Sequence, residues 1–101
     1  MAKGYWIAHV DVSNPEAYKA YQTANAIAFA KYGAKFLVRG GPSEQQEGST
    51  RSRHVVIEFK DYATALACYR SPEYAAAIAL RKGHSVADLL VVEGWDGPQP
   101  A

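Results

Sequence analysis

The sequence contains a single cysteine, Cys68, and no apolar stretch long enough to cross a membrane. One cysteine cannot form an internal disulfide, and its Leu-Ala-Cys-Tyr surroundings indicate the apolar face of a helix rather than a nucleophile. The first residues reach His9 and Asp11 before any apolar segment of signal length develops. We therefore expect a cytoplasmic protein.

The net charge is also small, and histidines are few. The formal net charge is +1, and the basic residues are scattered rather than gathered into a stripe that would follow a phosphate backbone. The 3 histidines, His9, His54 and His84, lack the close spacing of metal ligands. Gly40 and Gly41 stand outside any phosphate-binding glycine pattern. We expect no nucleic-acid partner, no metal and no tightly bound cofactor.

The length of 101 residues suits one domain with one core, and association between subunits would help to bury more surface. The prolines at 98 and 100 indicate a loose end. We expect a single domain over residues 1–96 and a C-terminal tail over residues 97–101.

What the sequence does contain is a repeated pattern of alternating strands and capped helices. Alternation of apolar and polar residues predicts strands at about 4–12, 34–40, 53–60 and 88–94. The segments Asn14-Pro15-Glu16 and Ser71-Pro72-Glu73 are typical helix starts, and they predict helices at about 15–32 and 62–82, the latter broken near Ser71. Residues 43–52 are polar and read as an exposed loop.

The order β-α-β-β-α-β predicts an α+β, ferredoxin-like fold. In this fold both helices cover one face of a four-stranded antiparallel sheet, with the strands in the order fourth, first, third, second. The more apolar face of each strand is expected under the helices: Trp6, Ala8, Val10, Phe36, Val38, Val55, Ile57, Phe59, Leu90 and Val92. The mixed faces would carry Tyr5, Ile7, Leu37, Val56, Leu89 and Val91. That is too much apolar surface to leave in water, so we expect a homodimer that buries the mixed faces.

Five segments resemble the domain-of-unknown-function 1330 family: residues 4–8 (GYWIA), 36–41 (FLVRGG), 56–59 (VIEF), 68–74 (CYRSPEY) and 91–94 (VVEG). The resemblance implies a ferredoxin-like subunit that pairs into a dimeric α/β barrel, and it implies no established reaction. The wider superfamily contains cofactor-independent monooxygenases, lactone isomerases and haem-binding enzymes, so the fold does not select a chemistry.

A candidate site lies on the mixed face. The predicted strand order brings His9, Arg39 and His54 to one end of that face, and gathers Tyr5, Lys35, Glu58 and Glu93 nearer the other. Arg39 would bind an anion, and His9, His54 and Glu58 are candidates for catalytic proton transfer. Tyr5 and Glu93 would complete the substrate-binding set.

Two interpretations remain open. In the first, the protein binds or converts a small organic acid or aromatic compound in the barrel interior. In the second, it is a non-catalytic binding or stress-associated dimer, in which Arg39 pairs with a carboxylate across the dimer and Glu58 pairs with Lys35. A site for a small molecule needs a cavity with convergent polar groups, whereas an assembly contact can be filled and dry.

Overall fold

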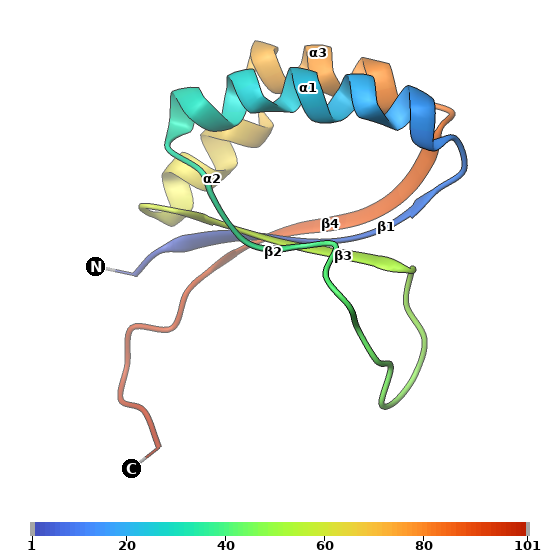
Figure 1. Cartoon of the computed structure of the whole chain (residues 1–101). Helices are drawn as coiled ribbons and strands as arrows, with labels where there is room; N and C mark the ends of the chain where they lie inside the picture. The colour runs from blue at the N-terminus through green and yellow to red at the C-terminus, as the bar shows by residue number, and fades with distance from the viewer. Residues whose placement is uncertain (1, 101) are drawn as a thin grey trace.

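The computed structural model describes residues 2–100 and has the ferredoxin-like fold (Figure 1). The elements follow the order β1 (Gly4–Val12), α1 (Pro15–Tyr32), β2 (Lys35–Arg39), β3 (Arg53–Phe59), α2 (Tyr62–Tyr69), α3 (Pro72–Arg81) and β4 (Ser85–Glu93). The sheet order is β2-β3-β1-β4, with every neighbouring pair antiparallel. All three helices lie on one side of the sheet, which confirms the predicted topology. None of the described helices is long and apolar enough to cross a lipid bilayer.

The helices begin and end at the residues that the sequence indicated. The Asn14 side chain accepts a hydrogen bond from the Ala17 amide, and Gly33 ends α1 in the left-handed conformation, with φ of 67°. At the break between α2 and α3, the Ser71 hydroxyl accepts from the Tyr74 amide at 3.1 Å and donates to the Cys68 carbonyl at 2.7 Å. The predicted interruption near Ser71 is therefore a change of helix direction fixed by a buried cap.

Trp6 is the centre of the core. Its side chain is 1% exposed, and its ring packs edge-on against the rings of Phe29 and Tyr74, at 5.3 and 4.8 Å between centroids. The indole Nε1 donates to the Ala65 carbonyl at 2.8 Å, so its polar atom is satisfied. The ring is thus fixed between the sheet and the helices.

The faces of β4 are the reverse of those expected. The strand begins at Ser85 rather than near 88, and its register sets Leu89 opposite Ala8 and Val91 opposite Trp6. Directly opposite residues share a face, so Leu89 and Val91 pack under the helices. Leu90 and Val92 turn away from them and are 51% and 38% exposed.

A β-bulge in β2 corrects a second prediction. Phe36 pairs with Ile57, but the next pair joins Val38 to Val56, so that Leu37 is an extra residue. The shift turns Val38 away from the helices and leaves it 41% exposed. Arg39, opposite Val55, therefore faces the helices instead of the mixed face.

The sheet surface away from the helices, called the open face below, is rich in apolar residues. The register places Ile7, Val38, Val56, Val86, Leu90 and Val92 there. No described helix covers this surface. The loop between β2 and β3 and the C-terminal segment both project on this side (Figure 1).

Candidate functional site

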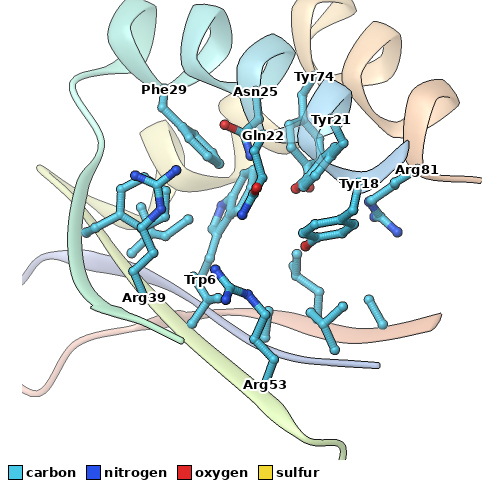
Figure 2. Close-up of a pocket in the computed structure, with 17 residues that line it drawn as sticks. Trp6, Tyr18, Tyr21, Gln22, Asn25, Phe29, Arg39, Arg53, Tyr74 and Arg81 are labelled. Carbon is cyan, nitrogen blue, oxygen red and sulfur yellow. The ribbon is translucent and has the colours of Figure 1, made fainter. Parts of the chain in front are cut away.

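A cavity lies between the helices and the sheet (Figure 2). Its apolar lining comes mainly from the strands and from α1: Trp6, Ala8, Val10, Phe29, Phe36, Val55, Ile57, Ala87 and Leu89. Its polar lining consists of Tyr18, Tyr21, Gln22, Asn25, Arg39, Arg53, Tyr74 and Arg81. The cavity offers about 40 Å³ to the centres of water molecules. One ordered water needs roughly 10 to 15 Å³ on that measure, so about three waters fill the closed cavity, and a larger ligand requires the lining to move apart.

Three arginines from three elements reach this cavity. Arg39 ends β2, Arg53 begins β3 and Arg81 ends α3. None of them forms an ion pair with a carboxylate in the described part of the chain, and no described Asp or Glu lines the cavity. The Arg53 Nε is buried and has no hydrogen-bond partner among residues 2–100. The cavity therefore carries positive charge that the protein itself does not neutralise.

Aromatic rings hold two of these arginines. The Arg39 guanidinium carbon lies 4.2 Å from the centroid of the Phe36 ring, and that of Arg81 lies 5.3 Å from the Tyr21 ring. Both distances are in the range of cation–π attraction. Burial opposes the charge of Arg81, but its interactions with Tyr74 and Tyr21 leave its pKa above the usual value. Aromatic rings thus orient both guanidinium groups, and Arg81 is charged at neutral pH.

Tyrosines form the helix side of the cavity. The hydroxyls of Tyr21 and Tyr74 lie 2.7 Å apart and share a hydrogen bond. Burial raises the pKa of Tyr74 well above its ordinary value, and the nearby Tyr21 adds to the effect. Burial also raises the pKa of Tyr18, although Arg53, Arg81 and Arg39 act in the opposite direction. Tyr18 and Tyr74 therefore remain protonated and can donate hydrogen bonds at neutral pH.

Two amides of α1 complete the polar lining. Asn25 is only 5% exposed, and its side chain points into the cavity beside that of Gln22 (Figure 2). No side-chain hydrogen bond joins either amide to another described residue. The amide of Asn25 faces the cavity, so it is available to a ligand or to water.

The cavity opens toward a surface groove below the start of α1. The groove is lined by Val12, Pro15, Tyr18, Lys19, Gln22, Gly40, Ser52 and Arg53. Tyr18, Gln22 and Arg53 belong to both spaces, so they stand at the mouth of the cavity. Gly40 has φ of 67°, and a Cβ there would overlap the Arg53 guanidinium. The glycine thus makes room for the arginine at the mouth.

The residues predicted from the sequence are divided between two faces. His9 and His54 meet on the open face, with their Nδ1 atoms 2.8 Å apart. Nearer the other end, Glu58 accepts a hydrogen bond from the Tyr5 hydroxyl at 3.4 Å and pairs with Lys3 at 3.3 Å. These residues lie close together as expected, although Glu58 forms its ion pair with Lys3 rather than with Lys35. Their catalytic and binding roles remain predictions.

Two predicted site residues lie elsewhere. The expected cluster of His9, Arg39 and His54 is wrong, because the bulge turns Arg39 into the helix-side cavity. Glu93 pairs with Gly4, so its register places it on the helix side of the sheet, where it is exposed at the strand end and apart from Tyr5. The open face thus lacks the anion-binding arginine assigned to it. Among the described residues, no group of three or more His, Cys, Asp or Glu has the arrangement of a metal site.

Sequence interpretation missed most of the polar cavity lining, although signals were present. Arg53 alternates with Val55 and Ile57, which places it on the helix side of β3. Tyr18, Tyr21 and Asn25 follow helical spacing along the buried side of α1. An arginine and an asparagine in such positions are the unusual residues of an apolar pattern.

A family model for a domain of unknown function, DUF1330, matches residues 3–95. The chain belongs to the DUF1330 family. No curated protein matches it. The family match spans every helix and strand of the structure, so the cavity is built from residues within the DUF1330 domain.

Solved structures share the fold of this DUF1330 chain. RPA0582 of Rhodopseudomonas palustris, a protein of unknown function, is 18% identical with a TM-score of 0.73, covering 95% of this chain and 85% of its own. SnoaB of Streptomyces nogalater, a cofactor-independent oxygenase, is 12% identical with a TM-score of 0.62, covering 99% and 97%. A dimeric ferredoxin-like protein of unknown function from Thermobifida fusca is 17% identical with a TM-score of 0.55, covering 90% and 92%. At these identities the likeness establishes the fold alone.

Proposed function

We propose that this DUF1330 protein binds a small organic anion with a flat apolar body in the helix-side cavity, without a tightly bound cofactor. The observation that carries the proposal is the meeting of Arg39, Arg53 and Arg81 in a largely apolar space with no carboxylate partner among the described residues. Of the three, Arg53 is half-buried, and its buried Nε has no hydrogen-bond partner among the described residues, which costs free energy. A ligand carboxylate offsets that cost through two parallel hydrogen bonds.

The apolar lining supports an aromatic or otherwise planar ligand. Trp6, Phe29 and Phe36 form a connected set of rings with edge-to-face contacts at 5.3 and 5.4 Å. A further ring would pack on such a surface in the same geometry once the lining moves apart, because the closed cavity of about 40 Å³ holds only a few waters. SnoaB, which has the same fold, is described as a cofactor-independent oxygenase. This fold is therefore compatible with small-molecule chemistry, while our proposal for the present chain is confined to binding.

We also propose that the protein is a homodimer that buries the open face. The apolar residues of that face have no cover within the described chain, and the related Thermobifida fusca protein is described as dimeric. In such a dimer His9, His54 and Glu58 would lie within the interface. Glu58 is already bonded to Tyr5 and Lys3 of the same chain, so it is less available to a ligand than the cavity arginines.

The proposal is tested by comparing benzoate with benzamide, which has the same ring but no charge. We expect benzoate to raise the melting temperature of the wild-type protein and benzamide to leave it unchanged. Arg53→Gln should weaken benzoate binding by about tenfold or more in calorimetry, since a hydrogen bond to a charged group contributes about 1.5–3 kcal/mol. Arg70→Gln, at an exposed arginine at the end of α2, is the matched control.

Two results would refute anion binding in this cavity. One is equal stabilisation by benzoate and benzamide, because an apolar pocket alone would bind both. The other is unchanged benzoate affinity in Arg53→Gln. Comparing the affinities of small carboxylates of different lengths and shapes then shows which apolar group the cavity prefers.

A further inference from the structure

The C-terminal segment leaves β4 on the side of the open face (Figure 1). Its first residue is fixed to the sheet, because the Gly94 amide donates a hydrogen bond to the Lys3 carbonyl at 2.7 Å. A Cβ at Gly94 would overlap the ring of Tyr5, so the backbone passes close to that ring. Tyr5 shares the open face with Ile7, since the two alternate along β1. The segment therefore begins in contact with the edge of the open face.

Trp95 is the most exposed of the large apolar side chains that the structure describes, at 72%. Its indole Nε1 donates a hydrogen bond to the Pro98 carbonyl at 2.9 Å. The backbone turns back over the indole, so that a Cβ at Gly97 would overlap its six-membered ring. The only polar atom of the side chain is thus satisfied within residues 95–98. Burial of this indole by a partner would leave no unpaired donor.

The open face lies between two projecting segments. The loop between β2 and β3 returns to the sheet at Arg53, opposite Val10. The C-terminal segment leaves the sheet beyond Glu93, opposite Gly4. The two segments therefore stand at opposite ends of β1, and both project on the open-face side (Figure 1). A partner that covers the open face would lie between them.

The charge of the open face suits a second copy of the same chain. The charged side chains that the strands place there, with their ion-pair partners, are the acids Asp11, Glu58 and Asp88 and the bases Lys3, Lys35 and Arg51. Acids and bases are equal in number, so two copies would not repel each other as two surfaces of one sign would. An apolar centre with a balanced rim can pack against itself across a two-fold axis.

We infer that the turn of residues 95–98 belongs to the dimer interface, where Trp95 of each subunit packs onto the partner subunit at the rim of the open face. This inference rests on the proposed homodimer, and it adds an anchor outside the sheet. A turn that is already ordered loses little conformational freedom on binding. Tryptophan is also enriched among the residues that dominate the free energy of protein interfaces.

Tryptophan fluorescence tests where the indole lies. The chain has 2 tryptophans, and Trp6 is buried within the subunit. Acrylamide, a neutral quencher, should therefore quench the wild-type dimer weakly and the Val56→Lys monomer severalfold more strongly. Trp95→Phe in the Val56→Lys monomer should remove this increase. Ile27→Lys, on the exposed side of α1, is the control and should be quenched as the wild type is.

The dissociation constant of the dimer tests whether the contact matters for assembly. Trp95→Ala should raise it about tenfold or more in analytical ultracentrifugation, as truncation of an interface anchor does. Leu80→Ala, at a 45% exposed position on α3, is the matched control and should leave it unchanged. Because Trp95 is exposed in the single chain, its substitution should not alter the fold.

The outcomes separate this inference from the proposed dimer. If the wild type is a dimer whose quenching equals that of the Val56→Lys monomer, the Trp95 contact is refuted and the dimer stands. A Trp95→Ala dimer with the wild-type dissociation constant refutes the contact equally. If the wild type is a monomer at micromolar concentration, the proposed dimer fails and this inference fails with it. Dilution of the wild type below its dissociation constant gives the same comparison if Val56→Lys does not fold.

Discussion

Gly40 combines a left-handed backbone with close approach to a cavity arginine. Its φ is 67°, and an added Cβ would overlap the Arg53 guanidinium. Gly33 has the same φ and open space around it. Gly40→Ala and Gly33→Ala should each lower the free energy of unfolding by about 1–2 kcal/mol, the usual cost of that backbone conformation for alanine. Urea unfolding measures this effect.

The two glycine variants differ in ligand binding. Gly40→Ala should also weaken benzoate binding severalfold in calorimetry, since it displaces Arg53, whereas Gly33→Ala should bind as the wild type does. Equal affinities in the two variants would mean that the position of Arg53 at the mouth does not matter for binding.

Buried protonated groups predict a loss of stability in alkali. Burial, with a contribution from Glu73, raises the pKa of the Cys68 thiol from 9.0 to about 12, and burial raises that of Tyr74 above 10.0. Both groups hold their protons more tightly in the folded state, so their contribution is complete below the ordinary pKa values and is lost as pH rises above them. The free energy of unfolding should therefore fall from about pH 9 upward.

Variants assign the alkaline effect to these side chains. Cys68→Ala and Tyr74→Phe should each make the free energy of unfolding fall less steeply above pH 9, whatever their cost at neutral pH. Urea unfolding at a series of pH values measures the slope. A slope identical to that of the wild type in both variants would contradict this assignment.

At the scale of the elements, the junction between α2 and α3 depends on one buried hydroxyl. Ser71 is 3% exposed and bonds both the Tyr74 amide and the Cys68 carbonyl, whereas Asn14 caps α1 in solvent. Ser71→Ala should cost about 2 kcal/mol and Asn14→Ala about 1 kcal/mol, because only the former leaves buried groups unpaired. Thermal or urea unfolding compares the two, and equal costs would show that burial of the Ser71 cap adds nothing.

Alternation and caps were sufficient to predict the elements and their order, but not every face. In β4 both alternating sets are apolar, so composition alone favoured Leu90 and Val92 for the core. Asp88 lies on the same face of β4 as Leu90 and Val92. Because Asp88 is polar, it indicated that this face points away from the helices.

The β2 bulge explains why Arg39 was expected on the wrong face of the sheet. A bulge arises from the pairing of two strands, and the alternating sequence of one strand does not show where it occurs. One extra residue at Leu37 turned Arg39 to the helix side of the sheet, opposite Val55, so that Arg39 and Arg53 both line the cavity. The cavity is lined from six elements, β1, α1, β2, β3, α3 and β4, and residue spacing within any one of them does not show how they come together.

For the whole molecule, the open face predicts the oligomeric state. Val56→Lys places a charge at the centre of the apolar surface and should convert the dimer to a monomer in light scattering at micromolar concentration. Ile27→Lys, at a 65% exposed position on α1, is the control and should remain dimeric. A wild-type protein of monomer mass would contradict burial of the open face.

Assembly and ligand binding should be separable. Each described chain supplies all the residues that line its own cavity. A folded Val56→Lys monomer should therefore bind benzoate with nearly wild-type affinity. Loss of binding on dissociation would mean that the partner subunit completes the site.

The most direct measurement is a crystal structure of the protein with a bound aromatic carboxylate. We predict that the carboxylate lies in the helix-side cavity, within hydrogen-bonding distance of the Arg39 and Arg53 guanidinium groups, with the ring against Trp6 and Phe36. A carboxylate bound instead on the open face beside His9 and His54, with the cavity arginines unliganded, would contradict the assignment of the site to the helix side of the sheet.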